Sequence, residues 1–187
     1  MFLSCRTMQK EYFDSERPAC EVREFFQCLN RLNRLFAFAE PFQRLLPEML
    51  SQANHASLSI LDLGAGDGSL GTTLNAWAVR RDWRCQITNL DSSLAALSLN
   101  PQGINVAASA TALPFREQSF DLVVASQMIH HLTSSTTIKV MREAWRVARH
   151  GILLCDLHRN ALLYIVLWLL FCFRRFPESF RSMLCYR

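Results

Sequence analysis

The stretch ILDLGAGDGSL, Ile60 to Leu70, decides the fold of this chain. It begins inside an apolar run, Ser59 to Leu63, which is typical of a strand buried on both faces of a sheet. Three glycines at alternate positions follow, and the segment from Ser69 to Arg80 then carries apolar residues at helical spacing. Glycines let the chain turn sharply and let a ligand approach the backbone. The stretch therefore predicts a strand, a ligand-binding turn and a helix.

The same alternation of apolar runs and helical segments continues along the chain. Strands are predicted at Ser59–Leu63, Cys85–Leu90, Ile104–Ala108, Phe120–Ala125 and Gly151–Leu157. Helices are predicted at Glu21–Glu40, from Pro41 to Leu50, and at Ser69–Arg80, Ser92–Leu99 and Ser134–Ala148. This order predicts an α/β fold, a Rossmann-like doubly wound sheet of about five parallel strands with helices on both faces.

Composition limits both the domain count and the class of partner. The chain has 187 residues, half of them apolar, which suits one domain with a sizeable core. We expect a single domain, 1–187, with a helical cap at 1–55, a binding core at 56–157, and an apolar helix and tail at 158–187. The formal charge of +4 is small and scattered, so no nucleic-acid partner is expected.

The seven cysteines bear on compartment and on metals. They are widely spaced and form no C-x-x-C pair, so no metal site is expected. Unpaired cysteines of this kind are typical of a reducing cytosol, and we expect a cytoplasmic protein.

One apolar segment near the C-terminus has two interpretations. Residues 161–173 are uncharged and lie between Arg159 and Arg174, but they are fewer than the ~20 that a membrane-spanning helix needs. They predict a buried helix or, because the flanks are basic, a helix that contacts a membrane surface or a protein partner. The second interpretation makes the chain peripherally membrane-associated.

The glycine turn itself distinguishes between ligands. A dinucleotide fingerprint, G-x-G-x-x-G, requires a third glycine where this chain has Ser69, so a nicotinamide dinucleotide is disfavoured. The carboxylates of Asp62 and Asp67 would repel a diphosphate, but they suit a ligand with an ammonium and a sulfonium. Asp91, at the end of the second predicted strand, can accept both hydroxyls of a ribose. These features favour an aminoacyl nucleoside.

At these residues the chain resembles the class I S-adenosylmethionine-dependent methyltransferases, through LDLGAGDGSLG and the acid Asp91. A second block, SATALPFREQSFDLVVASQMIHHL from Ser109 to Leu132, is similar to small-molecule methyltransferases of the ubiquinone and menaquinone biosynthesis type. The likeness extends from Leu58 to Leu157. It implies S-adenosylmethionine as cofactor and methyl transfer to a small acceptor, which we expect to be apolar or aromatic.

The resemblance also implies a set of site residues. Those implied to bind the cofactor are Asp62, Gly64, Ala65, Gly66, Gly68, Asp91, Ser92, Ser109, Ala110, Ser126 and Gln127. Among them, Asp62 would orient the ammonium; the alternative is a carboxylate that stabilises the loop by accepting backbone N–H groups. Asp91 would hold the ribose, and it could equally cap a helix.

Two positions carry further alternatives. The family usually has an acid at the position of Ser109 to bind adenine, so this residue is either an adenine contact or an ordinary strand-end serine. His130 or His131 could act as a base, which methyl transfer needs only when the acceptor is a weakly acidic hydroxyl. Otherwise one histidine packs under the sheet edge and the other is solvated.

The C-terminal part departs from the family. Class I methyltransferases usually add an antiparallel strand pair after the fifth strand, but the residues after Leu157 show no pair of alternating runs around a turn. The chain therefore looks truncated relative to the family. This favours an alternative function, a catalytically inactive or truncated methyltransferase-like protein that acts as a partner subunit or at a membrane surface through residues 161–173.

Overall fold

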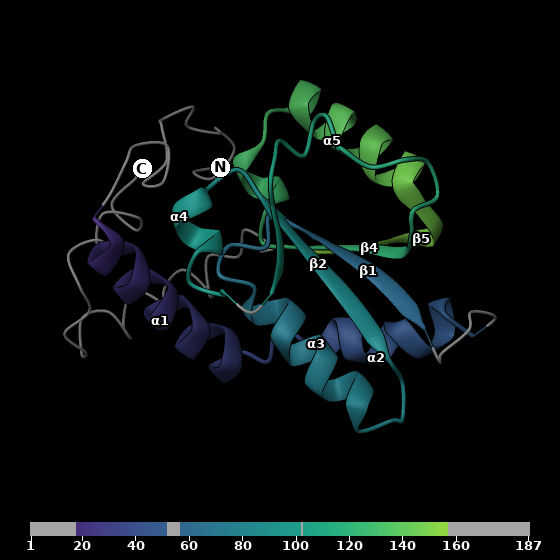
Figure 1. Cartoon of the computed structure of the whole chain (residues 1–187), viewed down its shortest axis with the longest axis horizontal. Helices are drawn as coiled ribbons and strands as arrows, with labels where there is room; N and C mark the ends of the chain where they lie inside the picture. Colours follow the sequence, from purple (N-terminus) through teal and green to yellow (C-terminus); the bar gives the residue numbers. More distant parts are fainter. Residues whose placement is uncertain (1–17, 52–56, 102, 157–187) are drawn as a thin grey trace, which may run out of the picture. The chain divides into compact units, whose positions relative to one another are not determined.

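The computed structural model describes residues 18–51, 57–101 and 103–156 of the chain (Figure 1). It divides the chain into two compact units, one of residues 32–156 and one of residues 1–31 together with 157–187. The elements are α1 (Ala19–Leu35), α2 (Glu40–Met49), β1 (Leu58–Leu63), α3 (Ser69–Val79), β2 (Cys85–Asp91), α4 (Leu94–Leu97), β3 (Ile104–Ala107), β4 (Phe120–Ser126), η1 (Ile129–His131), α5 (Ser134–Val147) and β5 (Ala148–Cys155).

The strands form one parallel sheet in the order β3-β2-β1-β4-β5, which confirms the predicted fold class. The chain moves outward from β1 through β2 and β3, and then returns to place β4 on the other side of β1. Loops that leave the carboxyl ends of β1 and β4 therefore diverge. In sheets of this kind ligands bind at such a switch point.

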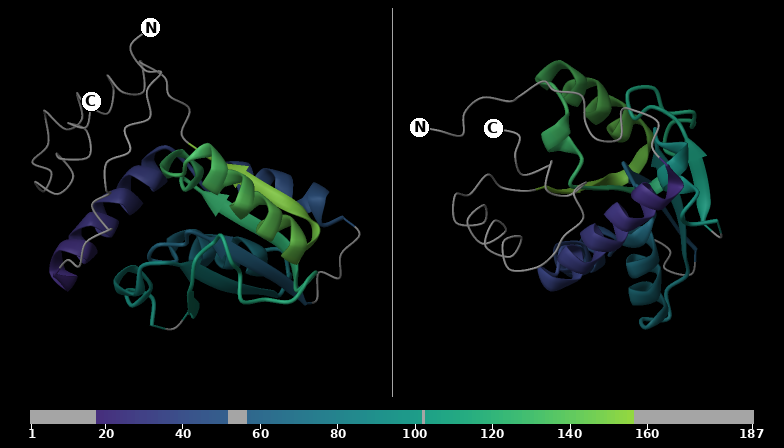
Figure 2. Two further views of the ribbon diagram at one scale, coloured as in Figure 1. Left: turned by 90° about the horizontal axis from the view of Figure 1, so that it is seen from above. Right: turned by 90° about the vertical axis from the view of Figure 1, so that its left-hand side faces the viewer.

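Helices cover both faces of the sheet, as the sequence predicts. Figures 1 and 2 show α2 and α3 on one face and α5 on the other. Successive side chains of a strand point to opposite faces, so Ile60 of β1 belongs to the first layer and Leu61 to the second. The first layer includes Phe42, Leu46, Leu74, Trp77, Leu122 and Val124, and the second includes Leu63, Val123, Val140, Ala144 and Val147.

The helix predicted over Glu21–Glu40 is wrong in its length. The structure ends α1 at Leu35 and begins α2 at Glu40. Between them Ala37 has a φ of +52°, a left-handed conformation that reverses the chain, and the Phe38 N–H donates to the carbonyl of Asn33 at 3.0 Å. A non-glycine residue seldom adopts this conformation, so the sequence gives no sign of the turn.

Two further boundaries differ from the prediction. The fifth strand begins at Ala148 rather than Gly151, because α5 ends at Val147 and the chain enters the sheet through the exposed Arg149 and His150. The helix predicted over Ser92–Leu99 is reduced to α4, which begins after Ser93, whose hydroxyl accepts from the Ala96 N–H at 3.2 Å.

The predicted C-terminal features lie outside the described residues. These are the apolar helix at 161–173, the tail, and the missing antiparallel strand pair. Among residues 18–51, 57–101 and 103–156, no helix combines the length and the apolar character needed to cross a bilayer.

Candidate functional site

The glycine turn after β1 is folded back against the end of β2. The N–H groups of Gly64 and Ala65 both donate to the carbonyl of Leu90, at 2.8 and 3.1 Å. The three glycines of the turn, Gly64, Gly66 and Gly68, have φ values of +67°, +56° and +71°. Other residue types are strained in this region, so the turn needs glycine for its backbone path as well as for space.

Asp91 ties the glycine turn to the end of β2. One carboxylate oxygen, Oδ2, accepts from the Gly66 N–H at 2.9 Å, and Oδ1 accepts from the Ser93 N–H at 2.8 Å. Asp91 is half-buried, and each of its oxygens can accept a further hydrogen bond. The carboxylate can therefore hold the turn and still accept ribose hydroxyls. The neighbouring Ser92 is exposed at the same edge.

The structure buries Asp62 beneath α3, with 1% of its surface exposed. The pKa of its carboxyl is raised to about 8, chiefly by burial and also by the nearby charges of Asp91 and Asp67, against a hydrogen bond from the Gly71 N–H. One of its oxygens, Oδ2, has no hydrogen-bond partner. This geometry favours the loop-stabilising interpretation, because the Gly71 N–H is among the donors that the start of α3 leaves unpaired.

Ser109 and Ala110 follow the end of β3. The exposed Ser109 hydroxyl lies 2.8 Å from the Thr111 hydroxyl and accepts from the Thr111 N–H at 3.2 Å. Ala110 is half-buried against the α5 layer. The serine therefore supports its own turn, and its hydroxyl is at the correct edge of the sheet for the predicted adenine contact.

Ser126 and Gln127 end β4 beside the glycine turn. Gln127 has a φ of +54°, and its side-chain Nε2 donates to the side-chain oxygen Oδ1 of Asn33 at 2.8 Å. The next residue, Met128, packs over the turn, because a Cβ added to Gly64 would lie 2.7 Å from Met128 Cγ. The ends of β1 and β4 therefore form one continuous site. Asn33 carries no sequence signal for its role.

The histidine pair follows in the short helix η1. The His130 ring nitrogen Nδ1 lies 2.6 Å from Asp156 Oδ1, and the His130 backbone N–H donates to Asp156 Oδ2 at 2.8 Å. His131 is exposed, and the two rings are 3.7 Å apart between centroids. Sequence reasoning missed Asp156, which it placed inside the predicted strand Gly151–Leu157, whereas β5 ends at Cys155 and the acid follows it at the edge of the sheet that carries the glycine turn.

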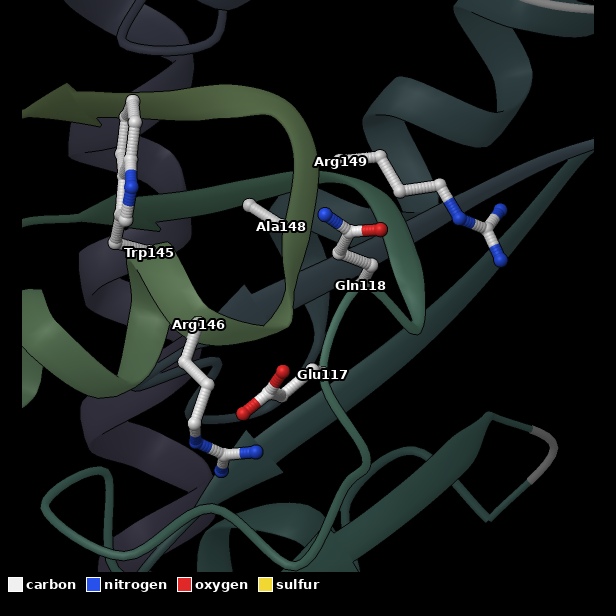
Figure 3. A pocket seen from close by; sticks show the side chains of 6 residues that line it. All are labelled: Glu117, Gln118, Trp145, Arg146, Ala148 and Arg149. Atoms are coloured by element: carbon white, nitrogen blue, oxygen red, sulfur yellow. The ribbon is translucent and has the colours of Figure 1, made fainter.

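A hollow on the described surface lies away from the glycine turn. It encloses about 400 Å³ and is lined by Glu117, Gln118, Trp145, Arg146, Ala148 and Arg149 (Figure 3). These residues lie where β4 and β5 begin, at the edge of the sheet opposite the glycine turn. The hollow is open and polar, and it is separate from the candidate site. Within the described residues, no cluster of three or more histidines, cysteines or acids could hold a metal ion.

The residues at the candidate site fit an aminoacyl nucleoside. A Cβ at Gly64 or Gly68 would come within 2.7 Å of a neighbouring side chain, so the turn packs in this conformation only with glycine at these positions. The half-buried acid of Asp91 suits a ribose, and no basic side chain comes from the turn to receive a diphosphate. These roles remain predictions for the individual residues.

Comparison with known proteins agrees with this geometry. A protein-family model described as a methyltransferase domain matches residues 61–155, about half of the chain. No curated protein matches the chain in sequence.

Solved structures share the fold. A putative S-adenosylmethionine-dependent methyltransferase from Methanococcus maripaludis is 13% identical, with a TM-score of 0.55 over 90% of this chain and 78% of that one. A putative methyltransferase from an antibiotic biosynthesis pathway of Anabaena variabilis is 21% identical, with a TM-score of 0.51 over 77% and 58%. The chain spans about half the length of several structures it matches. Its matched residues and its fold show that it belongs to the methyltransferase domain family, whose cofactor is S-adenosylmethionine.

Proposed function

We propose that this chain transfers the methyl group of S-adenosylmethionine to a hydroxyl of a small apolar or aromatic acceptor. When bound, the cofactor supplies an electrophilic methyl group on a sulfonium. The glycine turn and Asp91 would hold it. The observation that carries the proposal is the pairing of His130 with Asp156 at the carboxyl edge of the sheet.

His130 follows β4, which pairs with β1, the strand that leads into the glycine turn. It comes two residues after Met128, which packs over Gly64. Its side chain is 27% exposed and that of Asp156 is 24% exposed, so both groups of the pair are partly accessible. A base in this position can reach the proton of an acceptor that enters beside the glycine turn.

The pairing also selects the useful tautomer of the imidazole. An ionised carboxylate can only accept hydrogen bonds, so a contact of 2.6 Å to Asp156 requires the proton to lie on His130 Nδ1. The other ring nitrogen, Nε2, then has a lone pair that can take a proton from an acceptor hydroxyl. The imidazolium formed in this way is stabilised by the carboxylate. An amine or thiol acceptor has less need of such a base, and a hydroxyl is therefore favoured.

The class of the acceptor is proposed from the sequence resemblance and from composition. The Ser109 to Leu132 block resembles small-molecule methyltransferases, and apolar residues are frequent in the predicted cap and in residues 161–173. Apolar side chains of this kind typically line the binding sites of apolar small molecules. A contact of 161–173 with a membrane surface or a protein partner is the second proposal for that segment.

Calorimetric titration of the 187-residue chain with S-adenosylmethionine tests the first step, and S-adenosylhomocysteine serves as the product control. We expect binding near micromolar strength, about −8 kcal/mol. A folded chain that gives no heat with either compound would refute the enzyme and favour the partner-protein alternative.

A matched pair of variants tests the base. With a phenolic acceptor, we expect His130→Gln to lower kcat by about 10²–10⁴-fold and to leave cofactor affinity within about twofold. His131→Gln is the control, and we expect it to keep most of the activity. Equal losses in both variants, or a chain that methylates amines and not phenols, would contradict the assignment of His130.

A further inference from the structure

Three polar side chains form a row across the sheet, in which Asp62 and Asn89 are buried and Asn105 is half-buried. In the strand register, Asp62 of β1 lies opposite Asn89 of β2, and Asn89 lies opposite Asn105 of β3. Register partners in parallel strands point to the same face. That face is covered by α3, since a Cβ added to Gly71 would lie 2.8 Å from Asn89 Oδ1 and 3.9 Å from Asp62 Oδ2. Asp62 is 1% and Asn89 3% exposed, so this end of the row has almost no access to water.

The far end of the row fixes the direction of every amide in it. Asn105 Nδ2 donates to two backbone carbonyls, those of Leu97 at 3.2 Å and Asn100 at 2.7 Å. A carbonyl can only accept, so this nitrogen is assigned correctly and Asn105 Oδ1 must face Asn89. Asn89 Nδ2 donates to that oxygen at 3.0 Å. Because Nδ2 of Asn89 points toward Asn105, the side-chain oxygen Oδ1 of Asn89 points the other way, toward α3 and β1.

The near end of the row then holds two acceptors and no donor between them. Among the described residues, Asp62 Oδ2 and Asn89 Oδ1 are the buried side-chain polar atoms that lack a hydrogen-bond partner. They lie within 4 Å of the same point beside Gly71. Two unpaired buried oxygens are costly, and an ionised carboxylate among them is costlier still. A proton on Asp62 Oδ2 would supply the donor that this pair of oxygens lacks.

We propose that Asp62 is a neutral carboxylic acid that donates its Oδ2 proton to Asn89 Oδ1 and accepts the Gly71 N–H on its other oxygen. It thereby joins β1, β2 and the first turn of α3. In this role Asp62 and Asn89 are positioning residues that hold the glycine turn in place. Asp62 is then no ligand for the ammonium of the cofactor.

The charges around Asp62 agree with a neutral acid. Burial raises the pKa of Asp62 to about 8, with Asp91 and Asp67 acting in the same direction against the Gly71 hydrogen bond. Within the described part of the chain, α3 brings no ionisable side chain to Asp62, and its register partner in β4 is Val124. The protonation of Asp62 is inferred from the hydrogen-bond pattern of this chain. The conclusion that Asp62 does not bind the cofactor rests on the proposed function.

The test is Asp62→Asn, which has the shape of the neutral acid. Its amide can donate to Asn89 Oδ1 and accept from the Gly71 N–H. An acid with a raised pKa contributes stability that is complete below its unfolded pKa and is lost as pH rises toward the folded value. We therefore expect the Tm of the wild type to fall relative to the variant by roughly 3–5 °C for each pH unit between 5 and 8.

Infrared spectroscopy gives a second and direct measurement. At pH 7 the wild type should show the C=O stretch of a protonated, buried carboxylic acid, and Asp62→Asn should lose it. Asp67→Asn, which removes a carboxylate from the same turn, is the matched control and should keep the band. A wild type without the band, or a Tm difference that does not change with pH, would overturn the protonation.

Cofactor titration separates this inference from the proposed function. We expect Asp62→Asn to bind S-adenosylmethionine within about threefold of the wild type at pH 7. A loss of more than tenfold without a loss of Tm would instead make Asp62 an ionised ligand and overturn the positioning role. If the wild type itself binds no cofactor, the proposed function fails, but the melting and infrared measurements still decide the protonation of Asp62.

Discussion

Replacing Asp91 with alanine should weaken both the glycine turn and the binding of the cofactor. The carboxylate accepts from the Gly66 N–H at 2.9 Å and from the Ser93 N–H at 2.8 Å. Hydrogen bonds to a charged group contribute about 1.5–3 kcal/mol each when a partner is removed, although water can replace part of the loss at a half-buried site. We expect Asp91→Ala to lower the free energy of unfolding by about 2–4 kcal/mol.

The same substitution removes the predicted acceptor for the ribose hydroxyls. That loss should weaken S-adenosylmethionine binding by a further 1–3 kcal/mol or so, about 5- to 150-fold in Kd. Urea denaturation measures the stability and calorimetry measures the affinity, at a temperature where the variant remains folded. Glu117→Ala, an exposed acid at the opposite edge of the sheet, is the control.

The effect of Asp91→Ala on stability and its effect on cofactor binding are tested separately. An Asp91→Ala variant that binds the cofactor within twofold of the wild type would remove the ribose role. A variant with unchanged unfolding free energy would show that the two hydrogen bonds to the turn do not matter. Asp91→Asn keeps one acceptor oxygen without charge, and we expect it to lie between the wild type and the alanine variant on both measurements.

Two other substitutions test the frame of the site. Gly68→Ala should lower the unfolding free energy by about 1–3 kcal/mol, because φ is +71° and the added Cβ would lie 2.5 Å from Asn100 Nδ2; unchanged urea denaturation would refute this. Burial raises the pKa of Asp121, but hydrogen bonds from Ser59 and Arg149 outweigh burial and hold it below its usual range. A lowered pKa gives stability that is present above the unfolded pKa and is lost as pH falls. Asp121→Asn should therefore lose about 1–3 kcal/mol at pH 7, the difference should shrink as pH falls below the unfolded pKa of about 4, and a difference that does not shrink in acid would contradict the pairing of Asp121 with Arg149.

The sheet could be predicted because its strands are short apolar runs. The predicted starts and ends of the first four strands lie within one residue of those observed, because apolar residues dominate these short segments and turn residues flank them. The fifth strand lies at an edge, where Arg149 and His150 reach solvent, and its start was missed by three residues. The turn at Ala37 was missed because alanine does not signal a positive φ.

Within the site, the residues that sequence could find are those with a local motif. The glycines, Asp91 and the histidine pair lie in motifs of a few residues. Asp156 and Asn89 act on partners that are distant along the chain, and their roles become visible only when the strands are aligned. Asp62 was found, but its surroundings could not be: α3 covers it because Gly71 has no side chain to keep the helix away.

The acids of the glycine turn differ in burial. Asp91 is half-buried, and its two carboxyl oxygens accept the backbone N–H groups of Gly66 and Ser93. Asp62 lies under the start of α3, where the backbone N–H groups of a helix favour negative charge nearby. An ionised Asp62 would occupy that positive end permanently and repel an amino-acid carboxylate. A neutral Asp62 would leave the start of α3 able to attract the anionic group of an aminoacyl nucleoside, and Asp91 would be the acid that faces the ribose in the proposed function.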